Sequence, residues 1–289
     1  MGRWKGPVHV KTVKDLTAEG AACHVEAESE DGSKAKMEND LLKSHREFLK
    51  DTLRKEYDFS LTDQHKGVLA PPTQKSHDPT ARRIPLLVPS EFKNNISDID
   101  LFTAVIGRES RRRYLPDALS LAELSFLLFS TQGVRQSSHP SVSLRTVPSA
   151  GARHSFETYL LIRKVEDVDP GLYRYLPQEH ELVFSGEVED MEMRLALACF
   201  GQQFVGAGAV TFVWATIPYR MEWRYGLLAH RVILIDVGHV CQNLYLACEA
   251  IGAGTCGVAA YDQQEVDRLI GVDEEEEFAV YLAPVGKVR

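Results

Sequence analysis

Three β-rich runs that follow one another along the chain constrain the fold most. Residues 157–165 (ETYLLIRKV), 171–176 (GLYRYL) and 181–185 (ELVFS) partly alternate between apolar and polar side chains, and turn-forming residues separate them. Strands joined by such short connections pair antiparallel, because a parallel pair needs a long crossover between its strands. These runs therefore predict an antiparallel meander.

Helices are intermixed with these strands. Ser120 and Glu123 have the spacing of a capping box, an apolar run follows them, and Gly133 is a natural end for that helix. The patterns also predict helices over 188–202 and 239–251, and buried strands over 209–217 and 278–286. The strand–helix–strand alternation of a doubly wound parallel sheet is absent, so the predicted class is α+β.

Composition limits the partners and the compartment. With 33 Lys and Arg against 41 Asp and Glu, the formal charge is −8, which disfavours nucleic acid and anionic membranes as partners. The uncharged stretch 195–219 is long enough to span a bilayer, but its two Gln, three Gly and one Pro favour a helix end followed by a buried strand. The start of the chain shows no apolar signal segment, and the five Cys have no zinc-binding spacing. We expect a cytoplasmic protein with reduced thiols and no metal site.

The amino-terminal third differs from the rest of the chain. Short strands are conceivable over 7–13 and 21–28, a charged polar stretch covers 26–40, and a helix is expected over 41–57. Residues 62–89 are rich in Pro and polar side chains, as in an extended arm. We therefore expect an arm over residues 1–95 that lies across a main domain, residues 96–289, or across a partner subunit.

The segment Arg108-Glu-Ser-Arg-Arg-Arg113 places four arginines and a serine within six residues of an acidic chain. Guanidinium groups so close repel one another unless an anion offsets them, and Arg is well shaped for bidentate binding of phosphate. Lys287 and Arg289 form a second basic pair that could converge on the same phosphate. The alternative is a solvated charged turn with surface ion pairs.

The segment Gly252-Ala-Gly-Thr-Cys-Gly257 matches the GxGxxG spacing of dinucleotide-binding proteins, and Asp273 follows at a suitable distance. That fingerprint needs a strand before the glycines and a helix after them. Here a predicted helix precedes the glycines and a strand-like run follows. We interpret them as a helix end with a tight turn.

Two further segments are candidates for a site. Residues 148–154 (PSAGARH) form a loop of small residues, which would let the main chain approach a flat ligand, with Arg153 and His154 as hydrogen-bond donors. The alternative is an ordinary turn. Residues 220–225 (RMEWRY) mix charges with aromatic rings where a strand meets a helix, which suits the rim of a site or an interface.

Taken together, the blocks at 108–134, 144–162, 171–177, 201–215, 220–262 and 277–287 resemble the nitroreductase family of flavoproteins. Their order and content are most similar to its SagB-like branch, which includes azoline dehydrogenases of peptide maturation. Residues 1–40 carry no part of this resemblance.

The resemblance implies a nitroreductase-like FMN fold, with a central, mostly antiparallel sheet flanked by helices in an intertwined homodimer. Each flavin would lie at the subunit interface. The contacts to the FMN phosphate and ribityl chain would come from Arg108, Ser110, Arg112, Lys287 and Arg289. The partner subunit would contribute Pro148, Ser149, Ala150, Ala152 and Arg153. Main-chain donors to the flavin N5 would come from Ala259 and Ala260, and Gln202 would contact the isoalloxazine edge.

This sequence departs from the family patterns at two places. Ala259-Ala260 stands where many simple nitroreductases have a Glu followed by a Gly, so only main-chain donation remains. Arg224-Tyr225 stands where azoline dehydrogenases have a Lys-Tyr pair, and Arg is a poor general base. The second departure disfavours azoline oxidation and favours a reductase or a dehydrogenase of another kind.

The expected activity is an FMN-dependent hydride transfer between NADH or NADPH and an unidentified small acceptor. Tyr225 and Arg224 are the candidate catalytic residues on the substrate side. Two alternatives remain, namely a SagB-like dehydrogenase that oxidises azolines in peptides and a non-catalytic module whose arginines bind phosphate or nucleic acid.

Overall fold

The structure, a computed structural model, describes residues 34, 36–139 and 141–289. Its contacts divide the chain into two units, residues 1–56 and residues 57–289. In the first unit, residues 36–48 are helical and η1 (Thr52–Lys55) is a 3-10 turn. The strands considered over 7–13 and 21–28 lie outside the described residues.

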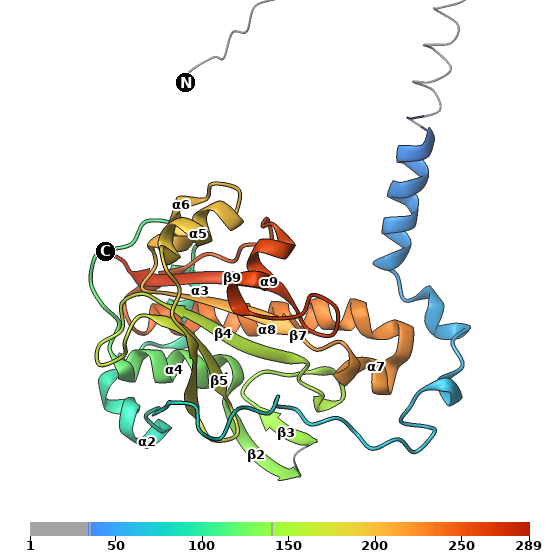
Figure 1. Cartoon of the computed structure of the whole chain (residues 1–289), viewed down its shortest axis with the longest axis horizontal. Coiled ribbons are helices and arrows are strands. Elements are labelled where there is room, and N and C mark those ends of the chain that lie inside the picture. Colours follow the sequence, from blue (N-terminus) through green and yellow to red (C-terminus); the bar gives the residue numbers. More distant parts are fainter. Residues whose placement is uncertain (1–33, 35, 140) are drawn as a thin grey trace, which may run out of the picture. The chain divides into compact units, whose positions relative to one another are not determined.

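The second unit is built on a seven-stranded sheet (Figure 1). Its strand order is β1 (Arg83–Pro85), β6 (Glu181–Gly186), β5 (Gly171–Leu176), β4 (Phe156–Ile162), β7 (Val210–Thr216), β9 (Phe278–Lys287) and β8 (Ala253–Thr255). Every neighbouring pair is antiparallel. The predicted meander is confirmed as β4–β5–β6, and so is the α+β class. A separate hairpin consists of β2 (Val134–His139) and β3 (Val142–Arg145).

Helices cover both faces of this sheet. On one face α4 (Leu121–Gln132) and α8 (Ala229–Glu249) pack with Leu160 and Phe212. On the other, α5 (Met191–Ala198), α6 (Gln203–Ala207) and α9 (Gln263–Ile270) pack with Leu161 and Val213. Because successive side chains of a strand point to opposite faces, β4 and β7 are buried along their whole length.

The helix boundaries follow local signals where such signals exist. Ser120 Oγ accepts the N–H of Glu123 at 3.2 Å, and the Glu123 carboxylate accepts the N–H of Ser120 at 2.9 Å, so the predicted capping box of α4 is confirmed. By contrast, α8 begins at Ala229, ten residues before the helix predicted from 239. Polar residues in its first turns, including Arg231 and Asp236, obscure the apolar period there.

The uncharged stretch 195–219 is divided between the end of α5, α6 and β7, as predicted. Among the described residues, no helix is both long enough and apolar enough to cross a membrane. The glycine-rich segment lies between α8 and β9, with Gly252 at φ +58° and β8 directly after it. A helix therefore precedes these glycines and a strand follows, opposite to the order that a dinucleotide fingerprint requires.

Residues 57–95 belong to the unit that contains the sheet, whereas the sequence analysis grouped them with residues 1–56 in a single arm. We call residues 57–76 the strap. The N–H of Gln64 donates to the Trp223 carbonyl at 2.9 Å, and the Trp223 indole donates to the Val68 carbonyl at 2.9 Å. Farther along, β1 pairs with β6 at the sheet edge, followed by α2 (Pro89–Phe92) and α3 (Leu101–Gly107).

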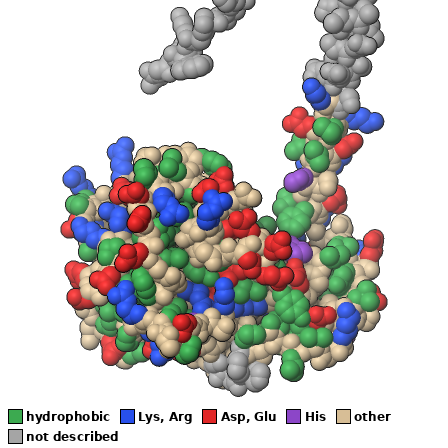
Figure 2. All heavy atoms as spheres, in the orientation of Figure 1, with side chains coloured by type: hydrophobic (Ala, Val, Ile, Leu, Met, Phe, Trp, Pro, Cys, Tyr) green, Lys and Arg blue, Asp and Glu red, His purple; other side chains and the backbone are tan. Residues whose placement is uncertain are grey.

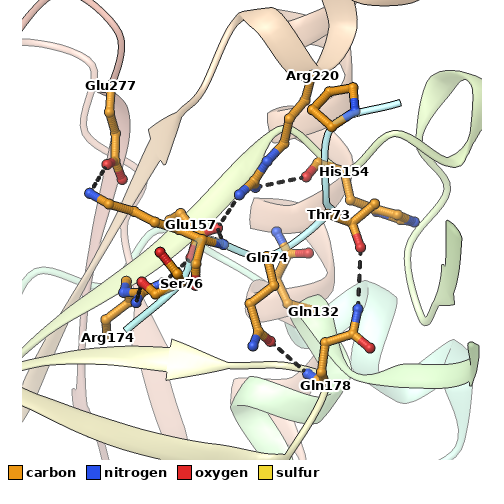
Figure 3. A network of polar contacts seen from close by, with 12 residues as sticks. Thr73, Gln74, Ser76, Gln132, His154, Glu157, Arg174, Gln178, Arg220 and Glu277 are labelled. Carbon is orange, nitrogen blue, oxygen red and sulfur yellow. Dashed lines mark hydrogen bonds and ion pairs between the residues drawn. The ribbon is translucent and has the colours of Figure 1, made fainter. Parts of the chain in front are cut away.

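Buried arginines hold the strap by its main chain, and Figure 3 shows one of them, Arg174, beside Ser76 of the strap. Arg145 donates to the Thr73 carbonyl at 2.7 Å, and Arg153 donates to that of Pro71 at 2.8 Å. Arg174 donates to the carbonyl of Lys75 at 2.9 Å. The contacts run to carbonyl oxygens, so they depend on the course of the strap more than on its side chains.

Glu157 lies at the centre of the same network. Its carboxylate accepts from Arg220 at 2.6 Å and from Arg174 at 2.8 Å, and it also accepts the N–H of Lys75 at 2.7 Å. Burial alone would raise the pKa of Glu157, but the two guanidinium groups outweigh burial and hold that pKa below its ordinary value. The charged form is therefore the structural one.

Candidate functional site

The arginine segment lines a hollow of about 570 Å³ near the end of β9. Its walls are residues 109–115 together with Val288 and Arg289. Ser110 bridges to Thr255 of β8, and the N–H of Arg111 donates to the Thr255 carbonyl at 2.9 Å. The segment is thus held extended beside the sheet edge. Three of its arginines, one glutamate and Arg289 surround a single hollow.

Tyr245 of α8 ties this segment to the glycine-rich turn. Its hydroxyl lies 3.1 Å from Ser110 Oγ and accepts the N–H of Gly257 at 2.7 Å. The guanidinium of Arg108 lies over the Tyr245 ring, 5.4 Å from its centroid. Arg108 therefore packs on the side chain that contacts Ser110 of the hollow, although Arg108 itself is not one of the lining residues.

Arg111 lies across Gly254, where an added Cβ would be only 2.4 Å from the Arg111 Cγ. One of its terminal nitrogens pairs with Glu109 at 2.6 Å. Its Nε is buried and has no hydrogen-bond partner among the described residues. A buried donor without an acceptor, beside several other cations, suits a site for an anionic ligand.

Lys287 does not line the hollow beside the arginine segment. Its ammonium forms an ion pair with Glu123 at the start of α4 and donates to the Ile251 carbonyl at 2.7 Å. The structure therefore brings Arg289 to the arginine segment but engages Lys287 in the fold. On the face drawn in Figure 2, basic and acidic side chains alternate instead of forming one broad basic stripe.

The loop of small residues meets the two candidate catalytic residues. Gly151 has φ +59°, and an added Cβ would lie 2.8 Å from Tyr225 Oη and 2.9 Å from Arg224 Nε. Both side chains come from α7 (Tyr219–Tyr225) and are half-buried. The structure thus joins two segments, 148–153 and 220–225, that the sequence analysis selected separately.

Arg153 and His154 are part of the fold at this loop. Arg153, only 3% exposed, donates to carbonyls of Arg220, Ser141 and Pro71. Burial lowers the pKa of His154 to about 3, so its imidazole is neutral at physiological pH. The guanidinium of Arg153 is thus committed to carbonyls of its own chain.

Pro148, Ser149 and Ala152 line a second hollow, of about 340 Å³. None of the loop residues 148–153 lines the hollow beside the arginine segment. The structure of one chain therefore leaves the two halves of the expected flavin site on separate hollows.

Gln202 contacts the Ala259-Ala260 pair in the segment that follows β8. The Gln202 amide donates to the Ala260 carbonyl and to the Cys199 carbonyl, both at 2.9 Å. Both alanines are exposed, and in the described part of the chain neither of their N–H groups has a hydrogen-bond acceptor. Two main-chain donors are thus available at this turn.

Three residues of these sites were missed at the level of sequence. Arg111 was part of the basic segment but was not assigned a contact. Tyr245 resembles any core aromatic of a helix, so no local signal could have selected it. Asp236 had a signal, since it is one carboxylate within the apolar run VILIDVG of α8, where it is 4% exposed.

Two relatives are similar to this chain over most of its length. A protein of Methanocaldococcus jannaschii described as a nitroreductase is 34% identical over 193 residues, which cover 67% of this chain and 93% of the relative. The trifolitoxin-processing protein TfxB of Rhizobium leguminosarum bv. trifolii is 25% identical over 240 residues, 76% of this chain. The chain spans 60% of the length of TfxB.

The fold is shared with solved structures. A crystal structure described as a nitroreductase from Ralstonia eutropha superposes with a TM-score of 0.58 at 24% identity, over 76% of this chain and 95% of the other. Residues 105–287, more than half of the chain, match the model of the nitroreductase family. That range includes the arginine segment, the loop 148–153, α7 and the glycine-rich turn, and the chain belongs to the nitroreductase family.

Proposed function

We propose that this member of the family is an FMN-dependent oxidoreductase that transfers hydride between NADH or NADPH and a small acceptor. The observation that carries the proposal is the hollow beside the arginine segment, with its four arginines, Ser110 and the unpaired Nε of Arg111. Guanidinium groups bind phosphate through paired, charge-assisted hydrogen bonds. An FMN phosphate is an anion that suits a hollow of this size and charge.

Other residues of the chain fit the rest of this cofactor. Arg108, Ser110, Arg112 and Arg289 would hold the phosphate, with Arg111 as an additional donor. The N–H groups of Ala259 and Ala260, which have no acceptor of their own in the described residues, would donate to the flavin ring. When bound, FMN would supply the hydride-transfer chemistry, and the protein would bind and orient it.

Tyr225 and Arg224 would act on the substrate side. Tyr225 can donate or accept a proton through its hydroxyl. The Arg224 guanidinium lies 5.6 Å from the centroid of the Tyr225 ring, and its role is to bind and orient an anionic or polar group.

A homodimer would bring the two hollows together. On α3, Leu101, Phe102 and Ile106 are each at least 67% exposed, and Leu234 and Ile235 of α8 are also exposed. Such apolar surface on a folded unit is typical of an interface. In the proposed dimer, the loop 148–153 of one subunit reaches the flavin held by the arginines of the other. The four described cysteines are buried and unpaired, which suits the cytoplasm.

The test is to purify the protein, record its visible spectrum, identify any released flavin and determine the oligomeric state. We expect a yellow dimer that releases FMN and loses its flavin absorbance when NADH or NADPH is added without oxygen. A colourless protein that FMN cannot reconstitute would overturn the proposal.

A second function is favoured by one observation. TfxB, which matches 76% of this chain, is named for the processing of a peptide, trifolitoxin. The alternative activity, which the resemblance to the SagB-like branch implies, is an oxidation of azolines in a peptide. A flavin that is reduced by a heterocyclised peptide, but not by NADH or NADPH, would favour this alternative.

A further inference from the structure

A buried carboxylate of α8 holds the loop 148–153. Asp236 is 4% exposed, and its two carboxylate oxygens lie 3.1 and 3.4 Å from the N–H nitrogen of Ala150. The Ser149 side chain also favours the charged form of this carboxylate and lowers its pKa. The N–H of Ala150 begins η4 (Ala150–Ala152), the short 3-10 turn that contains Gly151.

Burying a carboxylate at this position costs free energy. Among the described residues Asp236 forms no ion pair with Lys or Arg, and His239 is the neighbouring group that favours its charge. Burial raises the pKa of Asp236, while Ser149 and the N–H of Ala150 act in the opposite direction. Its neighbours on the helix, Ile233 and Val237, are buried and apolar, so a hydrophobic side chain would serve packing alone.

The contacts of Asp236 determine what the loop can offer to a ligand. Ser149 Oγ accepts the N–H of His154 at 3.0 Å. The hydroxyl of Ser149 is thus used within the loop, and the turn at Gly151 is fixed against Tyr225 and Arg224. What the loop presents outward is its main chain.

We propose that Asp236 is a positioning residue that sets the main-chain conformation of residues 149–151, so that this turn meets the flavin and the substrate side of the site. The inference rests on the proposed function for the identity of the ligand. The same helix carries Tyr245, nine residues later and about 13 Å along the axis, which holds the arginine segment. In the proposed dimer, one helix of each subunit therefore supports the loop that reaches one flavin and the arginine segment that holds the other.

The test compares Asp236→Ala and Asp236→Asn with a matched control, Asp267→Ala. Asp267 is also a buried carboxylate, and it accepts the N–H of Ala279 at 2.6 Å and the Gln263 amide at 2.7 Å. It lies on α9, on the other face of the sheet. Both alanine variants are expected to lose stability, so stability alone decides nothing.

The deciding measurements are amide hydrogen exchange of residues 148–154 and the circular dichroism of the bound flavin. For Asp236→Ala we expect faster exchange in this loop, an altered flavin spectrum and about tenfold weaker FMN binding. Asp236→Asn, which keeps an acceptor oxygen, should lie between this variant and the wild type. Asp267→Ala should match the wild type in all three.

Wild-type exchange in this loop and a wild-type flavin spectrum in Asp236→Ala would overturn the inference, as would equal changes in Asp267→Ala. The exchange measurement needs no flavin. If the wild type failed to bind FMN, the proposed function would fall, while the exchange rates would still decide whether Asp236 sets the loop.

Discussion

The hydroxyl of Tyr245 lies 3.1 Å from the Oγ of Ser110, and the same hydroxyl accepts the N–H of Gly257. One aromatic side chain of α8 thereby joins the arginine segment to the glycine-rich turn, two segments far apart in the sequence. The glycine-rich turn, which was interpreted as a helix end, thus also helps to position the serine of the candidate phosphate site.

Tyr245→Phe should weaken FMN binding while the ring beneath Arg108 remains. The variant leaves Ser110 Oγ and the Gly257 N–H without their shared partner, and one hydrogen bond is worth about 0.5–1.5 kcal/mol, or roughly a twofold to tenfold change in Kd. A fluorescence titration of the apoprotein with FMN measures this change. Tyr261→Phe is the control, because its hydroxyl donates to the Ala279 carbonyl, away from the hollow. Equal FMN affinity in Tyr245→Phe and the wild type would contradict the assignment.

Arg108→Ala should distinguish FMN from riboflavin, which lacks the phosphate. A hydrogen bond to a charged group is worth about 1.5–3 kcal/mol, so FMN affinity should fall roughly 10- to 150-fold and riboflavin affinity should stay unchanged. Retention of flavin after dialysis and isothermal titration with both ligands test this. Arg268→Ala removes an exposed arginine whose one ion pair within the described part of the chain is with Glu265, and it should leave both affinities unaltered. If riboflavin binding fell as much as FMN binding, Arg108 would be stabilising the fold and not the phosphate.

The parts of the fold that were predicted correctly depend on nearby residues. The capping box of Ser120 and Glu123 is complete within four positions, and the three runs of the meander carry their own turns. The arginine segment was equally visible, because its charges are adjacent in sequence. Composition selected the loop 148–154 and residues 220–225 separately, and the family resemblance added their roles, because no local pattern connects the two segments.

The remaining relationships are tertiary and have no local signature. Lys287 pairs with Glu123, 164 positions away, so its charge alone could not reveal that it lies outside the arginine hollow. An arginine such as Arg153 can donate to a ligand or to a main-chain carbonyl. Only the course of the strap shows that Arg153 donates to the Pro71 carbonyl. The attachment of residues 57–76 depends on main-chain carbonyls, which every residue type possesses, so composition predicted an extended arm across the main domain but not its points of attachment.

His154→Asn should alter how stability depends on pH. The pKa of His154 is about 3 in the folded protein because burial disfavours its charge, whereas an unfolded His titrates near 6.5. Below that pH the unfolded chain takes up a proton that the folded chain refuses, so this residue destabilises the fold as the pH falls. Between pH 7.5 and 5.5 the wild type should lose about 1.4 kcal/mol more than the variant.

Asn suits this position because His154 has φ +46°, a conformation that Asn tolerates. Urea unfolding at the two pH values measures the difference, and the other titratable groups cancel because both proteins contain them. A gap between the two proteins that stays constant from pH 7.5 to 5.5 would show that His154 is not held neutral.

The stability of a chain shortened at the amino terminus should depend on whether the strap is kept. A chain that begins at Tyr57 keeps the complete unit of residues 57–289, and we expect its melting temperature to equal that of the full chain. A chain that begins at His77 lacks the Pro71 and Thr73 carbonyls, which leaves donors of the buried guanidinium groups of Arg153 and Arg145 without acceptors. Each buried charged donor without its partner costs at least about 1–3 kcal/mol, so the shorter chain should melt much lower or fail to fold. Differential scanning calorimetry compares the three chains, and equal melting temperatures for the chains from 57 and from 77 would show that the strap is not part of the fold.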